Sequence, residues 1–306
     1  MKFPFNGKEW YIDKILATQL LTLVYNIKKD WDFVLLISGD RMVRVGKSVL
    51  GMTVCAFLCY AMNAYKIKTK FDLDDIFFDN SIMMDTVYNK PQYAINMYDE
   101  GREGLAASKT MKSIQQDILD FFAECGQLNQ IFVIVLPDFF ELKEPVAIGR
   151  SEFLLNVYRK PIAKEMDILG IGEKQPVVGF QRGFFQLFNR QRKAQLFDKA
   201  RTTRRKNYGL VKANVIGRFT NQYPLDENLY RVKKMEALKR FQQKKEEESK
   251  PRKDTRIRDK LILELYSKKI NQQEIANIME SKYDEQLTRQ RINQIIHSFK
   301  QNQAIA

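Results

Sequence analysis

The chain has 306 residues, 44% of them hydrophobic and 29% charged, which is enough to bury one substantial α/β core and a small second domain. Three cysteines and a single histidine, His297, exclude a disulfide framework, a Cys/His zinc site and a histidine-based catalytic triad. No uncharged apolar run reaches about 18 residues and the first residues lack a signal-peptide apolar core, so we expect a cytoplasmic protein without an integral membrane segment.

The positive charge is concentrated in one part of the sequence. The chain carries a formal net charge of +14, and residues 190–260 alone hold 23 Lys and Arg against 9 Asp and Glu, a net of +14. A basic excess confined to one segment indicates a polyanionic partner, and nucleic acid is the commonest one. The alternative is a solvated basic surface.

The stretch from Phe33 to Tyr60 is typical of a phosphate-binding loop. An unbroken apolar run, Phe33 to Ile37, predicts a buried parallel strand, and an apolar helix follows Gly46-Lys47-Ser48. In this order, backbone N–H groups at the start of the helix face a phosphate, the lysine adds a positive charge, and the serine offers a hydroxyl to Mg²⁺. We therefore expect ATP and Mg²⁺ as ligands, with Lys47 in a catalytic role as well.

The loop departs from the usual spacing. A glycine is expected five residues before Gly46, where this chain has Arg41, and Gly39 lies two residues further back. The loop is therefore either two residues longer or carries an arginine that, like Arg44, could act as an arginine finger within its own chain. The alternative is a chance Gly-Lys-Ser at an ordinary strand-to-helix turn. The residues predicted to bind nucleotide are Gly39, Arg41, Arg44, Val45, Gly46, Lys47, Ser48 and Val49.

A second apolar strand ends in two carboxylates. Tyr93 to Tyr98 reads as a strand, and Asp99 and Glu100 follow it. Downstream of a phosphate-binding unit, this is the arrangement of a Walker B motif. We expect Asp99 to join Ser48 in holding Mg²⁺, and Glu100 to activate the water that attacks the γ-phosphate. An ordinary acidic turn after a strand is the alternative for this pair taken alone.

Other elements of the first 150 residues continue the alternation of helices and strands. Asp138, just after a buried strand, is a candidate sensor of the γ-phosphate or, as the alternative, a cap of a helix or turn. The predicted elements are an amphipathic helix over Tyr11–Lys29, a strand and a short helix within Phe71–Asn89, a helix over Ser108–Gly126 and a buried strand over Ile131–Leu136.

Two later segments add strands. Phe153–Tyr158 predicts a strand, and the alternation within Val177–Phe188 predicts a β-hairpin arm whose weak point is Gly183. Arginines here could reach the active site of a neighbouring subunit. Arg150 is the first candidate for this arginine finger, ahead of Arg159 and Arg182, and a surface or structural role is the alternative for each.

The segment from Arg190 to Lys212 interleaves basic residues with Phe197 and Tyr208, without a deep apolar pattern. We expect it to contact the DNA phosphate backbone without reading bases. The predicted contacts are Arg190, Arg192, Lys193, Arg201, Arg204, Arg205 and Lys206.

The last fifty residues predict three short helices. We expect an ATPase domain over residues 1–225, a charged helix and linker over 226–255, and an all-α helix-turn-helix domain over 256–306. The hydroxyl of Thr288 can cap the third helix, whose first residues suit base edges in the major groove. These DNA contacts are Thr288, Arg289, Gln290 and Arg291; a small protein-docking module is the alternative.

Two further segments, VIVLPDFF at Val133–Phe140 and GRFTNQYP at Gly217–Pro224, join the Gly-Lys-Ser loop and the Asp99–Glu100 pair. Together, within about residues 10–240, they resemble the P-loop ATPases of phages and archaeal mobile elements described as zonular-occludens-toxin-like. Those proteins are related to the FtsK/HerA DNA translocases and, more loosely, to terminase motors. The resemblance implies an α/β, RecA-like core of the additional-strand, catalytic-glutamate type, with a mostly parallel sheet flanked by helices.

These features predict an ATP-hydrolysing DNA motor or DNA-processing ATPase of a virus or mobile element. We expect it to act as a homo-oligomeric ring, because an arginine finger in trans requires one, and on duplex rather than single-stranded DNA. A nucleotide-gated, sequence-specific DNA-binding regulator or partition protein is one alternative. A structural binding protein with a degenerate loop is the other.

Overall fold

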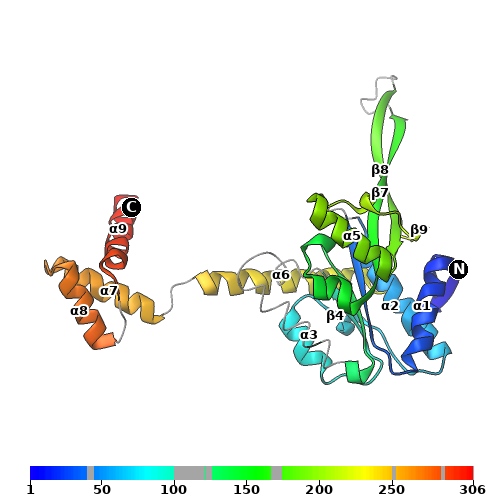
Figure 1. Ribbon diagram of the computed structural model, residues 1–306, viewed down its shortest axis with the longest axis horizontal. Coiled ribbons are helices and arrows are strands. Elements are labelled where there is room, and N and C mark those ends of the chain that lie inside the picture. Colours follow the sequence, from blue (N-terminus) through cyan, green and yellow to red (C-terminus); the bar gives the residue numbers. More distant parts are fainter. Residues whose placement is uncertain are drawn as a thin grey trace. The chain divides into compact units, whose positions relative to one another are not determined.

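The computed structural model describes residues 1–39, 45–99, 121, 126–166, 174–249, 253–283 and 287–305. The chain forms two compact units, Met1–Ala237 and Leu238–Ala306. The first unit runs past the predicted boundary at residue 225 because it includes the first half of helix α6 (Glu227–Ser249; Figure 1). The helix predicted over Ser108–Gly126 lies almost wholly outside the described residues.

Within the described part of the first unit, seven strands form one sheet in the order β4-β5-β6-β3-β7-β8-β9. Strands β4 to β7 pair in parallel, whereas β8 is antiparallel to β7 and β9 antiparallel to β8. The predicted mostly parallel α/β sheet is therefore confirmed. Its strands are β3 (Phe33–Gly39), β4 (Ile76–Phe77), β5 (Ile95–Asp99), β6 (Ile131–Val135), β7 (Ser151–Met166), β8 (Gln175–Phe188) and β9 (Val215–Arg218). A separate hairpin, β1 (Lys2–Phe5) and β2 (Lys8–Tyr11), precedes it.

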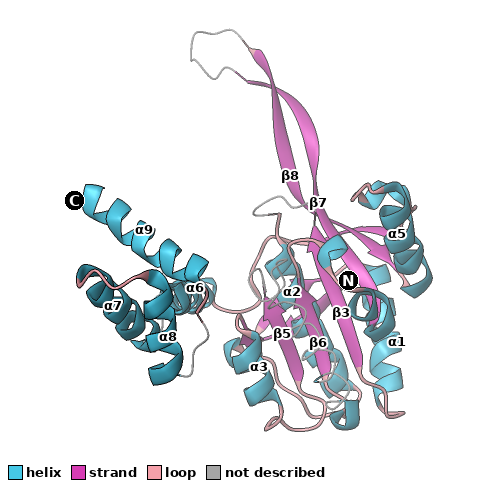
Figure 2. Cartoon of the chain, turned by 60° about the vertical axis from the view of Figure 1, so that its left-hand side comes forward, coloured by secondary structure: helices cyan, strands magenta, loops and turns pink. Residues whose placement is uncertain are grey.

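Side chains of β3 alternate between two buried clusters. Phe33, Leu35 and Ile37 pack with α1 (Lys14–Ile27) and α2 (Lys47–Ala64), while Val34 and Leu36 pack in a second cluster. That second cluster includes α3 (Asn80–Val87) and α5 (Arg190–Thr203). Burial on both faces explains the unbroken apolar run of β3, and it gives the three-layer arrangement seen in Figure 2.

Helix α2 is apolar on nearly all sides. Among the described helices it is the one long and apolar enough, by length and composition, to cross a membrane, but most of it is buried inside this domain. It packs against the sheet and against α1 and β1. These are the contacts of the core helix of a globular domain.

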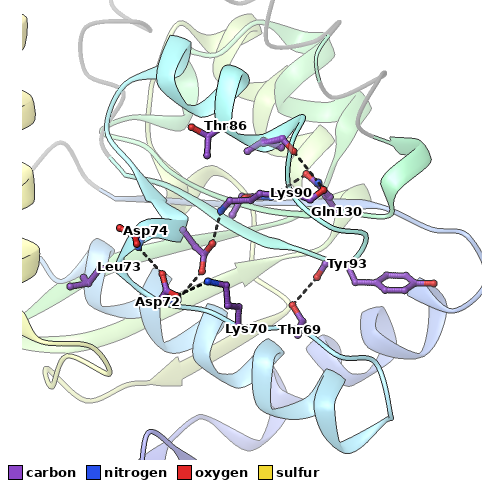
Figure 3. A network of polar contacts seen from close by, with 12 residues as sticks. Thr69, Lys70, Asp72, Leu73, Asp74, Thr86, Lys90, Tyr93 and Gln130 are labelled. Carbon is purple, nitrogen blue, oxygen red and sulfur yellow. Dashed lines mark hydrogen bonds and ion pairs between the residues drawn. The ribbon is translucent and has the colours of Figure 1, made fainter.

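Polar contacts hold the short edge strand β4 in place (Figure 3). The Lys90 ammonium lies 2.5 Å from the Asp75 carboxylate and over the Phe77 ring. Gln130 donates to the Val87 carbonyl at 3.2 Å. Carboxylates in this acidic stretch also cap its short helices: Asp79 accepts from the Ser81 N–H at 2.8 Å at the start of α3. The sequence-predicted strand and short helix within residues 71–89 are thus both present.

The stretch Val177–Phe188, predicted as a hairpin arm, belongs to a single strand. It is most of β8, which has 14 residues and pairs with the 16-residue β7 to form the arm. Gly183 has a φ of 92° and lies at the base of this arm.

The second unit, in its described part, contains the three predicted helices, α7 (Lys253–Ser267), α8 (Gln272–Tyr283) and α9 (Arg289–Ile305). Its buried centre is formed by Ile262, Ile275, Met279, Ile292 and Ile296. The neighbouring Leu261, Leu263 and Leu265 are partly buried against it.

Lys193 corrects the prediction for the basic segment. Residues 190–203 form α5, and Lys193 is fully buried with its ammonium on the carbonyl and hydroxyl of Ser151. Phe197 and Tyr208 are buried too. The prediction that Lys193 contacts DNA was wrong because its side chain has no exposed surface, and the two aromatic rings are core residues.

Burial of Lys193 predicts a pH dependence of stability. Burial lowers the pKa of this lysine from 10.5 to about 7. Between about pH 7 and pH 10.5 the unfolded chain therefore holds a proton that the folded protein has released, so this group makes the free energy of unfolding rise with pH. We expect Lys193→Met to remove that slope, so that its stability relative to wild type falls by about 2–4 kcal/mol from pH 7 to pH 10.

Urea unfolding at several pH values measures the effect. Lys199→Met is the matched control, because Lys199 is exposed on the same helix. Equal slopes for the two variants would contradict the assignment.

Candidate functional site

The carboxyl edge of the sheet carries the start of α2. Strand β3 ends at Gly39 and α2 begins at Lys47, with Gly46 as its N-cap at φ 102° and ψ 18°. A side chain is strained at this left-handed φ, and a Cβ on Gly46 would lie 3.1 Å from the Phe219 ring. The first N–H groups of an 18-residue helix have no partner within the helix, and its amino end carries a partial positive charge, so it favours an anion.

Ser48 and Asp99 meet at this edge. The Ser48 hydroxyl donates to Oδ1 of Asp99 at 3.0 Å, although one strand, β6, separates β3 from β5. Asp99 is the last residue of β5 and has no exposed surface. Adjacent hydroxyl and carboxylate oxygens fit the preference of Mg²⁺ for a few oxygen ligands completed by water and phosphate.

Helix α6 contributes two side chains that sequence reasoning missed. The Tyr230 hydroxyl donates to Oδ2 of Asp99, and the Lys234 ammonium lies 3.4 Å from the same oxygen. The Tyr230 ring packs between Phe78 and Tyr223, at centroid distances of 5.8 and 5.6 Å. Burial and then the Asp99 carboxylate raise the pKa of Tyr230, so it remains a protonated donor. The available signal was a tyrosine with a lysine four residues later, which places both on one helix face.

Lys47 lies beside the end of β3. It is partly buried, and its Cδ would lie 3.4 Å from a Cβ on Gly39. The side chains of Val45 and Val49 are buried, so only their backbone groups could face a ligand. The structure thus brings together Gly39, Val45, Gly46, Lys47, Ser48, Val49 and Asp99, as the sequence predicted.

A comparison of the chain with protein-family models finds no match, and a comparison with curated proteins finds none either. The interpretation of the site therefore rests on its geometry.

Three predicted residues, Arg41, Arg44 and Glu100, lie outside the described residues, and their roles stay predictions. Asp138 caps the turn η3 (Phe139–Glu141), since its carboxylate accepts from the Phe140 N–H at 3.0 Å. This contact supports the capping alternative over the γ-phosphate sensor.

Arg150 is not near the site in its own chain. It precedes β7 at the amino edge of the sheet, level with the start of β3, and its guanidinium lies 3.7 Å from the Asp32 carboxylate. The lower-ranked candidates Arg159 and Arg182 lie beyond the carboxyl edge, where β7 and β8 leave the sheet. A finger from Arg150 could act only on a neighbouring subunit.

The predicted DNA contacts of the basic segment, apart from Lys193, are exposed: Arg190, Arg192, Arg201, Arg204, Arg205 and Lys206. Arg201 pairs with Glu144 at 2.6 Å on the surface. In the second unit, the Thr288 hydroxyl accepts from the Arg291 N–H at 3.3 Å, which confirms the predicted cap of α9. Arg289, Gln290 and Arg291 are exposed on the first turn. Among the described residues, no group of three or more His, Cys, Asp or Glu is placed to hold a metal ion.

Removal of the Tyr230 hydroxyl should destabilise the first unit. We expect Tyr230→Phe to lower the free energy of unfolding by about 1–3 kcal/mol, because a buried carboxylate loses a donor. Urea unfolding without Mg²⁺ measures this change. Tyr25→Phe, at an exposed position of α1, is the control and should have little effect. Equal costs for the two variants would show that the bond to Asp99 contributes nothing.

Proposed function

We propose that this protein is an ATP-hydrolysing DNA motor or DNA-processing ATPase. The observation that carries the proposal is the contact between Ser48 and Asp99 at the amino end of α2, next to Lys47. In this proposal Lys47 and the helix N–H groups bind the β- and γ-phosphates, Ser48 and Asp99 hold Mg²⁺, and Glu100 activates water.

The order of the strands supports this choice. Ligands of open α/β sheets bind at the carboxyl ends of parallel strands, which is where Gly39 and Asp99 lie. One additional strand, β6, stands between the strand of the loop and the strand of the carboxylate. That is the order implied by the resemblance to additional-strand ATPases.

DNA as the partner is supported by charge. Seven exposed basic side chains lie on α5 or on the three residues that follow it, and residues 190–260 carry the net charge of the whole chain. Such a surface binds phosphates without regard to sequence. A motor that tracks along duplex DNA needs this kind of contact.

ATP hydrolysis that responds to DNA tests the proposal directly. We expect ATP turnover with Mg²⁺ to rise several-fold when duplex DNA of mixed sequence is added. Lys47→Ala should lower turnover by about 100-fold or more, because the developing charge on the phosphates loses its cation. Lys28→Ala, at an exposed position before β3, is the control and should leave turnover unchanged. Failure of the wild-type protein to bind ATP with Mg²⁺ would favour a structural binding protein with a degenerate loop.

An oligomeric ring is part of the proposal, since Arg150 could act as an arginine finger only on a neighbouring subunit. Native mass measurement with ATP, Mg²⁺ and duplex DNA should show a multiple of the protomer mass. Monomers alone under these conditions would remove the ring and the finger in trans.

The second candidate is a nucleotide-gated, sequence-specific regulator. It is favoured by one observation, the capped α9 with Arg289, Gln290 and Arg291 exposed on its first turn. A regulator should prefer one DNA sequence and turn over ATP slowly, whereas a motor should respond to any duplex.

A further inference from the structure

Strands β7 and β8 continue well beyond the sheet. Gly39, the last residue of β3, is paired with Val157, and β7 then runs on from Tyr158 to Met166 against β8 (Figure 2). At about 3.3 Å per residue, this two-stranded arm extends roughly 25 Å past the carboxyl edge. The arm therefore begins at the same edge as the amino end of α2.

The surface of the arm is apolar on one side and basic overall. Register places Pro161 opposite Phe180 and Ala163 opposite Val178, and 54% of Phe180 and 62% of Val178 is exposed. An isolated two-stranded ribbon is marginally stable in water, and an exposed apolar patch marks a place of interaction.

The cations of the arm outnumber its carboxylates. The described arm residues include five cations and one carboxylate: Arg159, Lys160, Lys164, Lys174 and Arg182 against Glu165. The sequence that joins the strands adds Asp167 and Glu173. Lys160, Lys164 and Arg182 are exposed, and the Arg159 guanidinium lies over the Phe180 ring at 4.5 Å. Arg159 therefore lies on the apolar face beside Phe180, whereas Lys160 and Lys164 alternate with Pro161 and Ala163 and lie on the other face of the ribbon.

The direction of the arm is fixed at its base. The β7–β8 register shifts between Tyr158 and Lys160, which is a β-bulge. Opposite this bulge, the Gly183 carbonyl accepts from the Phe219 N–H at 2.9 Å, and a Cβ on Gly183 would lie 2.6 Å from the Phe219 carbonyl oxygen. Only glycine fits this approach at a φ of 92°. The bulge and the glycine therefore shape the point at which the arm leaves the sheet.

We propose that the arm is a duplex-DNA-binding element. Charge complementarity favours this partner. The exposed cations of the arm can pair with DNA phosphates, and the apolar strip can lie in the groove between them. A two-stranded ribbon also fits the major groove, which is about 12 Å wide. Phe180 with its stacked Arg159 enters the groove, and Arg182 contacts a phosphate. Lys160 and Lys164, on the other face of the narrow ribbon, reach phosphates along the groove walls. This inference rests on the proposed DNA-dependent function, and it adds a contact surface separate from α5.

Salt-dependent binding tests the arm. The variant Lys160→Ala/Lys164→Ala/Arg182→Ala of the full chain is compared with wild type by fluorescence anisotropy on a labelled duplex longer than one helical turn. We expect about 10-fold or weaker binding near 0.1 M salt. The slope of log K against log salt should fall in magnitude by about 2–3, since each lost phosphate contact removes about 0.9.

The control is Lys28→Ala/Lys29→Ala/Lys68→Ala, which removes the same charge from exposed positions at the opposite edge of the sheet. It should keep the wild-type slope, and thermal melts should show both variants folded.

Three results would count against the proposals, each in a distinct way. If the wild-type protein binds no duplex, the DNA-dependent function itself fails. If wild type binds duplex and the two triple variants weaken binding equally, the arm proposal is overturned. A loss of oligomer mass in the arm variant, with duplex affinity unchanged, would assign the arm to a second copy of this chain instead.

Discussion

A buried carboxylate governs the arrangement of the first unit. Asp99 has no exposed surface, and an uncompensated buried carboxylate would cost several kcal/mol. Ser48 satisfies one oxygen, while Tyr230 and Lys234 satisfy the other. These donors lie 51 to 135 residues away in the sequence. The start of α2, the end of β5 and the first turns of α6 therefore meet at Asp99. Loss of a donor from α2 or α6 would leave the buried Asp99 carboxylate with an oxygen that is not fully compensated.

The same hydrogen bonds to Asp99 also affect how a cation could bind there. Both oxygens of Asp99 already accept hydrogen bonds, so in the proposed function Mg²⁺ at this carboxylate would compete with the donors on α6 for Oδ2. Metal binding and the position of α6 would then be thermodynamically linked, and each would change the equilibrium of the other by the same free energy. Lys233, the neighbour of Lys234, also donates to the Leu73 carbonyl at 2.5 Å, which ties α6 to the turn before β4. Movement of α6 would therefore alter contacts at the turn before β4 as well as at the site.

The sequence was most informative where burial is complete. Strands β3, β5 and β6 are buried on both faces, so their residues form apolar runs that show in a single sequence, and Asp99 stands out at the end of one of them. Tyr230 could not be predicted in this way, because the apolar residues of the highly charged helix α6 give no helical periodicity that singles it out. Lys193 was different: Lys193, Leu196, Phe197 and Ala200 have the spacing of a buried helix face, with a lysine at its first position. The sequence prediction treated Lys193 as exposed because it is charged, and it therefore missed this buried helix face.

Phe219 contacts both the base of the β7–β8 arm and the start of α2. Its backbone pairs with Gly183 at the base of the arm, and its ring lies against Gly46 at the start of α2. Both glycines have positive φ and no room for a side chain, so neither contact can relax by a simple rotation. Close-packed interiors transmit strain instead of absorbing it. A load on the arm would therefore act on the backbone of Phe219 and an anion at the amino end of α2 on its ring, which makes this residue a direct physical connection between the two.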